Sequence, residues 1–141
     1  MVFDLTEVRN DRIEFEILRL QEFIEERLFS DIEADSIEVR FDTEVNLDAD
    51  GFCTQEDDDS YLIEISTQLR GEDLIRTLIH ELVHVRQYLL GSLEQIHVDG
   101  KGPRMYWNSK DMTDRSYDDR PWEIEAHGVE YRLCSEFLSL Q

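Results

Sequence analysis

Cysteine is scarce in this sequence of 141 residues, with Cys53 and Cys134 as its only thiols. Two cysteines this far apart, neither with a close cysteine or histidine partner, exclude a disulfide framework and a zinc knuckle. Both are therefore expected to be reduced and buried, as in a cytoplasmic protein.

Long apolar runs are also missing. No segment approaches the roughly 18 uninterrupted apolar residues of a membrane span. The first residues, MVFDLTEVRNDR, lack the basic region and apolar run of a secretory signal. The sequence has no internal repeat, proline-rich linker or low-complexity tract. With 40% hydrophobic residues, it is expected to fold as one domain over residues 1–141, away from membranes.

Basic residues are few, with 14 Lys and Arg against 34 Asp and Glu and a net charge of −20. The first 70 residues alone carry 21 acidic and six basic side chains. A field of this sign repels phosphates, so direct binding to nucleic acid is disfavoured. The charge suits a basic protein partner, or a protein that mimics DNA, although solubility alone also accounts for it.

Apolar residues recur at helical spacing in three segments. The first runs from Asp11 to Phe29, and the second runs from Glu72 to Leu90, where Gly91 is placed to end it. The third begins at Pro121, a residue suited to the first position of a helix, and ends near Leu138. The sequence thus predicts an N-terminal, a central and a C-terminal helix.

Between the first two helices the pattern changes to that of strands. The stretch SIEVRFD at 36–42 alternates apolar and polar residues, and SYLIEIST at 60–67 is strongly apolar. A turn at Asp48 to Gly51 precedes a short strand at 52–54. Residues 91–120 look irregular, with room for one short strand in GKGPRMYW. The order of elements predicts an α+β fold with a small antiparallel or mixed sheet.

The central helix contains TLIHELVHVRQ, in which His80 and His84 lie one helical turn apart on the same face. Their imidazoles can converge on one zinc ion, and Glu81 lies where its carboxylate can reach a water molecule on that ion. Zinc lowers the pKa of such a water toward about 7, and the carboxylate takes its proton as the water attacks a carbonyl. Thr77 and Gln87 share this polar side and are expected to line a cleft or to orient the ligands. The alternative is a polar stripe whose histidines are hydrogen-bonded to carboxylates.

HELVH on an apolar helix, after the strand YLIEIST, resembles the zincin metallopeptidases. In that family the strand before the helix pairs with the substrate backbone. The resemblance therefore implies a peptide added antiparallel along Tyr61–Thr67. One position departs from the family pattern, because Arg86 stands where zincins usually have a hydrophobic residue.

A catalytic zinc ion needs a third protein ligand besides the histidines and an open position for water. The extended motif H-E-x-x-H-x-x-G-x-x-H is absent, since position 90 is a leucine. The stretch PWEIEA resembles the compact gluzincin-like peptidases, including small single-domain ones of bacteria and phages. Their third ligand is a glutamate on a later helix, often followed by a small residue. The resemblance covers Tyr61 to about Leu133 and implies Glu125 as the ligand, with Glu123 and His127 as alternatives.

Metallopeptidases of this kind use a tyrosine or histidine to stabilise the developing oxyanion. Four side chains are available for this role, Tyr117 first, then Tyr106, Tyr131 and His97.

The sequence as a whole predicts a cytoplasmic zinc metallopeptidase that acts on a peptide or protein substrate. Its zinc ligands are expected to be His80, His84 and Glu125, and its general base is expected to be Glu81. The alternative is a non-catalytic, acidic interaction protein or DNA mimic with a structural metal site.

Overall fold

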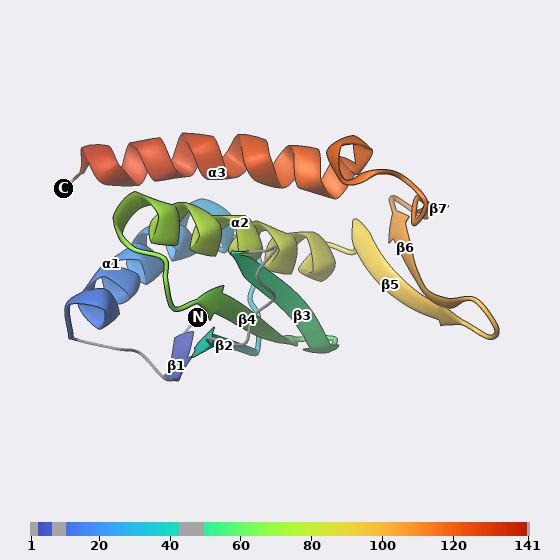
Figure 1. The fold of residues 1–141 in the computed structure, drawn as a ribbon, viewed down its shortest axis with the longest axis horizontal. Helices are drawn as coiled ribbons and strands as arrows, with labels where there is room; N and C mark the ends of the chain where they lie inside the picture. The colour runs from blue at the N-terminus through green and yellow to red at the C-terminus, as the bar shows by residue number, and fades with distance from the viewer. Residues whose placement is uncertain (1–2, 7–10, 43–49, 141) are drawn as a thin grey trace.

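The computed structural model describes residues 3–6, 11–42 and 50–140, which form an α+β fold (Figure 1). The helices are α1 (Asp11–Leu28), α2 (Gly71–Leu89) and α3 (Pro121–Ser139), with a short 3-10 helix, η1 (Tyr117–Asp119), before α3. The strands are β1 (Phe3–Thr6), β2 (Ser36–Asp42), β3 (Gly51–Asp57), β4 (Ser60–Ser66), β5 (Leu93–Val98), β6 (Gly102–Trp107) and β7 (Lys110–Asp111).

The larger sheet is mixed, with the strand order β1-β2-β4-β3. β1 and β4 both run parallel to β2, whereas β3 runs antiparallel to β4. β4 therefore has hydrogen-bonded neighbours on both sides, and β3 is an edge strand among the described residues. This corrects the expectation for Tyr61–Thr67, because a strand paired on both edges has no free backbone groups to offer a substrate.

One face of this sheet carries the core. The apolar side chains of β2 and β4 alternate inward and are almost fully buried, among them Val39, Ile63 and Ile65. They pack with the apolar side of α2, in which Leu78 and Leu82 are fully buried. Burial of such side chains stabilises the fold by about 1.5–3 kcal/mol each.

Three layers result, with the sheet below, α1 and α2 in the middle and α3 on top (Figure 1). α3 packs along α2 and reaches α1 near the C-terminus, where the rings of Phe137 and Phe23 lie 5.4 Å apart. Arg27 of α1 forms an ion pair with Glu136 of α3 at the same place. The layers fix the angle at which α3 crosses α2, and this crossing builds the site described below.

The α+β class and the three helices predicted from the sequence are confirmed. Gly91 follows α2 with a positive φ of 76°, and Pro121 begins α3. Cys134 is buried, Cys53 is half-buried, and both thiols are free. Asp48 and Ala49, the first two residues of the turn expected at Asp48 to Gly51, lie outside the described residues. No described helix combines the length and the apolar character needed to span a membrane.

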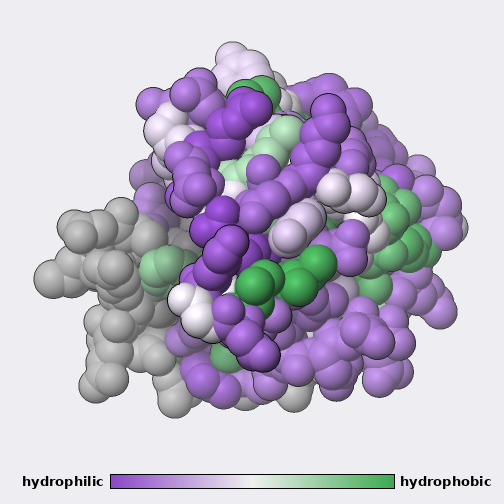
Figure 2. All heavy atoms as spheres, turned by 90° about the vertical axis from the view of Figure 1, so that its right-hand side faces the viewer, coloured by the Kyte–Doolittle hydropathy of each residue, from purple (hydrophilic) through white to green (hydrophobic). Residues whose placement is uncertain are grey.

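Residues 91–120 are less irregular than expected, because they contain the antiparallel sheet β5-β6-β7. The short strand expected in GKGPRMYW is β6. This small sheet projects from one end of the molecule (Figure 1). Leu93 is its single buried residue among those described. Figure 2 looks at this end and shows a mostly hydrophilic surface with small hydrophobic areas.

Candidate metal centre

Two helices bring three potential metal ligands together. His80 and His84 lie on α2, and Glu123 lies in the first turn of α3. Glu123 Oε1 is 2.9 Å from His80 Nε2 and 3.1 Å from His84 Nε2, and the two nitrogens are 3.2 Å apart. Zinc bonds of about 2.0–2.1 Å in a tetrahedron place ligand atoms about 3.4 Å from one another. The spacing of the three donors therefore matches the surroundings of a single ion.

Glu125, the ligand expected from the resemblance, does not reach the histidines. It is exposed, and its Oε1 accepts a hydrogen bond from Gln87 Nε2 at 3.0 Å. Successive helical residues are about 100° apart, so residues 123 and 125 point in different directions. The side of α3 that buries Ala126 also carries Glu123, three residues earlier, toward α2. The structure thus places the alternative, Glu123, in the position that was expected for Glu125.

The outer nitrogen of each histidine also has a partner. His80 Nδ1 is 2.9 Å from Glu130 Oε1, and His84 Nδ1 is 2.8 Å from Gln87 Oε1. Such contacts fix the orientation of an imidazole and the nitrogen that it presents to a metal. Gln87 was expected near the ligands, whereas Glu130 was missed. The only feature of the sequence that could have indicated Glu130 is its position two helical turns after Glu123, on the same side of α3.

Glu81 is buried beside the three donors, with only 5% of its surface exposed. Its Oε2 has no hydrogen-bond partner in the part of the chain that the structure describes. An unpaired buried polar group costs about 1–3 kcal/mol. Burial also raises the pKa of this carboxyl group. The unpaired oxygen of Glu81 can therefore accept a hydrogen bond from a molecule that binds in the cleft.

The electrostatics favour positive charge between the histidines. Burial acts against a proton on His80, but hydrogen bonds to Glu123 and Glu130 outweigh burial and raise its pKa to about 10. The pKa of His84 is raised for a similar reason, against the effect of burial. Burial would raise the pKa of Glu123, yet hydrogen bonds with both histidines hold it well below its ordinary value. A divalent cation would satisfy the same field, so the donor set fits zinc.

The donors lie in a cleft of about 1060 Å³ that is walled by β3, α2, the small sheet and the start of α3. Tyr117 reaches into it, with its hydroxyl 3.2 Å from Glu123 Oε1 and 3.0 Å from His127 Nε2. Thr77 and Tyr131 also line the cleft, and Tyr131 is largely exposed. The other two residues considered for the oxyanion, Tyr106 and His97, do not line it.

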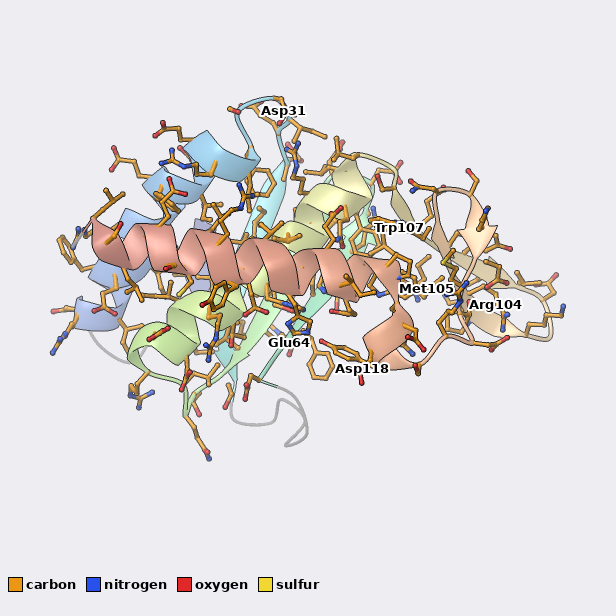
Figure 3. The ribbon with its side chains drawn as sticks, turned by 90° about the horizontal axis from the view of Figure 1, so that it is seen from above. Asp31, Glu64, Arg104, Met105, Trp107 and Asp118 are labelled. Carbon is orange, nitrogen blue, oxygen red and sulfur yellow. The ribbon has the colours of Figure 1, made fainter. Side chains whose placement is uncertain are left out.

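Arg86, the departure from the zincin pattern, points away from the cleft. Its guanidinium pairs with the carboxylate of Asp31 at 2.7 and 3.0 Å and also donates to the carbonyl of Leu28. Asp31 lies just past the end of α1, on the opposite side of α2 from Asp118 (Figure 3). The arginine therefore ties the last turn of α2 to α1, and these bonds do not involve the three candidate donors.

Comparison with known proteins identifies no matching protein family, curated protein or solved structure.

Proposed function

We propose that this protein is a zinc metallopeptidase of the HExxH type, with His80, His84 and Glu123 as zinc ligands. The observation that carries the proposal is the meeting of these donors beside Glu81, whose buried Oε2 has no partner among the described residues. When bound, zinc would act as a Lewis acid on water and on the scissile carbonyl.

Glu81 would act as the general base. Its raised pKa makes it a better proton acceptor than an ordinary glutamate, and its unpaired oxygen is available to the attacking water. The proton would then pass to the leaving amine. Tyr117, whose hydroxyl lies beside Glu123, is well placed to donate a hydrogen bond to the developing oxyanion.

The substrate would lie along β3, the described edge strand that lines the cleft. Main-chain hydrogen bonds to a free strand edge bind extended peptides with little dependence on sequence. β3 therefore takes the role that the resemblance assigned to Tyr61–Thr67, with the peptide added antiparallel to it.

Metal analysis and peptidase assays on matched variants test the proposal. Purified wild-type protein should contain about one zinc ion per chain and cleave an unfolded protein such as reduced casein. His80→Ala should lose the zinc, whereas Glu81→Gln should keep it and lose cleavage. Glu64→Gln makes the same chemical change on the outer face of the sheet and should resemble wild type.

Two results would count against the peptidase. If the purified protein contains no metal, the proposed zinc site is wrong. If Glu81→Gln cleaves as well as wild type, Glu81 is not the general base. Zinc that is retained without cleavage of any unfolded protein or peptide library would favour the acidic, non-catalytic interaction protein instead.

A further inference from the structure

The cleft changes chemical character along α2. Asp73, Thr77, His84 and Tyr88 all line it, and they mark successive parts of the helix from its N-terminal to its C-terminal end. Each turn advances about 5.4 Å, so the lined part of α2 spans roughly 20 Å. The N-terminal end is charged, because Arg76 there pairs with Asp73 at 2.7 Å. The ligands lie in the middle.

The C-terminal end of the cleft is apolar. Beyond Tyr88 it is lined mainly by Leu93 of β5, Met105 of β6 and Trp122 of α3. Arg120 also lines the cleft, with its guanidinium 5.9 Å from the centre of the Trp122 ring. Leu93 and Trp122 are almost fully buried, and Met105 is half-buried. The ring of Trp107 lies 6.5 Å from that of Trp122 and supports it from the small sheet. Figure 3 shows Met105 and Trp107 projecting from β6 toward the start of α3.

The direction of β3 decides which part of a bound peptide meets this end. Gly51, at the start of β3, lies against Thr77 in the first half of α2. Gln55, near the end of β3, is hydrogen-bonded to Tyr61, whose ring lies 6.0 Å from that of Tyr88. β3 thus runs along α2 in the same direction. A peptide antiparallel to β3 would place its N-terminal part at Tyr88 and its C-terminal part at Thr77.

The distance from His84 to the apolar end of the cleft indicates which residue of the bound peptide would reach that end. Tyr88 lies one turn beyond His84, which is about 5.4 Å along the helix axis. A strand advances about 3.3 Å per residue. The side chain that meets the apolar end is therefore that of the first or second residue before the scissile bond.

We propose that Leu93, Met105 and Trp122 form a pocket that selects peptides with a large apolar side chain just N-terminal to the scissile bond. The inference rests on the proposed function and names the substrate class of the same site. Leucine, phenylalanine and methionine would lose little by leaving water there, whereas aspartate or lysine would lose hydration that Leu93, Met105 and Trp122 cannot replace. Apolar pockets discriminate by about tenfold or more per side chain.

Cleavage-site mapping tests the preference. Zinc-loaded wild-type protein should cleave a peptide library with apolar side chains enriched about tenfold or more before the scissile bond. Met105→Asp places a carboxylate in the pocket and should abolish this preference or shift it toward basic side chains. Ile96→Asp is the matched control, because Ile96 lies in the same small sheet, is 41% exposed and does not line the cleft. It should keep the wild-type profile.

Binding without cleavage separates the two proposals. The only tryptophans of the sequence, Trp107 and Trp122, lie at the apolar end, so their fluorescence reports its occupancy. In the zinc-loaded Glu81→Gln protein, a tryptophan-free peptide with a central leucine should change the fluorescence at concentrations about tenfold lower than its aspartate counterpart.

Each outcome decides one proposal. Cleavage without apolar preference, or an unchanged profile for Met105→Asp, overturns the pocket and leaves the peptidase standing. If the fluorescence shows preferential binding of the leucine peptide but the wild-type protein cleaves nothing, the pocket is supported and the peptidase is overturned. Equal binding of the leucine and aspartate peptides overturns the pocket.

Discussion

Glu123 and Glu125 are two residues apart in α3 and have different surroundings. Glu123 contacts both histidines, whereas Glu125 contacts Gln87. Glu123→Gln should lower zinc affinity by more than the 10–100-fold that is typical for loss of an outer contact. Glu125→Gln should stay within about tenfold of wild type. Competition with a chromophoric chelator measures both, and a reversal of this order would make Glu125 the ligand.

Gln87 acts one contact away from the proposed metal. Its Oε1 accepts from His84 Nδ1, and its Nε2 donates to the carbonyl of Trp122 at 3.0 Å. Gln87→Leu keeps a similar size but removes these two bonds and the bond to Glu125, so zinc affinity should fall about 10–100-fold. Gln87→Glu retains the acceptor for His84 and should bind zinc more tightly than Gln87→Leu does. Equal affinities in the two variants would show that this contact does not orient the ligand.

At the scale of elements, the features that could be predicted from the sequence are those that follow from the spacing of apolar residues. α1, α2 and α3 each bury one apolar side, so their spacing is visible in the sequence. The juxtaposition of His80 and His84 follows from α2 alone. Of the small sheet, only the strand in GKGPRMYW was expected. β5 was missed because it buries only Leu93 and its other residues follow no inward alternation. The choice of Glu123 could not be made from sequence. It depends on the rotation of α3 against α2, which packing around Ala126 sets.

The position of β3 against α2 depends on a glycine. A Cβ at Gly51 would lie 3.0 Å from Thr77 Cγ2, 3.1 Å from the carbonyl oxygen of Glu64 and 3.2 Å from Ile65 Cδ1. Gly51→Ala should therefore lower the free energy of unfolding by about 1–3 kcal/mol, as overpacking does. Thr77→Ser removes the closest contact and should restore part of this loss.

Gly128→Ala is the control for that substitution, with the opposite expected sign. Nothing lies within 4 Å of a Cβ at Gly128, and the residue is in the interior of α3. Alanine should raise the free energy of unfolding by about 0.5–1 kcal/mol through helix propensity. Urea denaturation measures both changes. A loss of stability at Gly128 equal to that at Gly51 would refute the steric explanation.

At the scale of the whole molecule, the proposed metal site would link metal binding to proton binding. The folded pKa of His80, about 10, exceeds its ordinary value of 6.5, so the folded state holds this proton more tightly than the unfolded chain does. The resulting stability is fully present below pH 6.5 and is lost as the pH rises toward 10. In EDTA, the urea midpoint should therefore fall over this window, and His80→Gln should flatten the decline. Apparent zinc affinity should rise over the same window, because zinc must displace the proton.

The net charge of −20 opposes folding at low ionic strength. The range of charge interactions falls from about 30 Å at 0.01 M salt to about 10 Å at 0.1 M, so added salt should relieve repulsion in the folded chain. A gain of about 1 kcal/mol would raise Tm by roughly 3–6 °C in a domain of this size. Calorimetry in EDTA with increasing sodium chloride measures the rise. Choline chloride should act equally if screening is the cause, whereas a rise confined to sodium would indicate a bound ion instead.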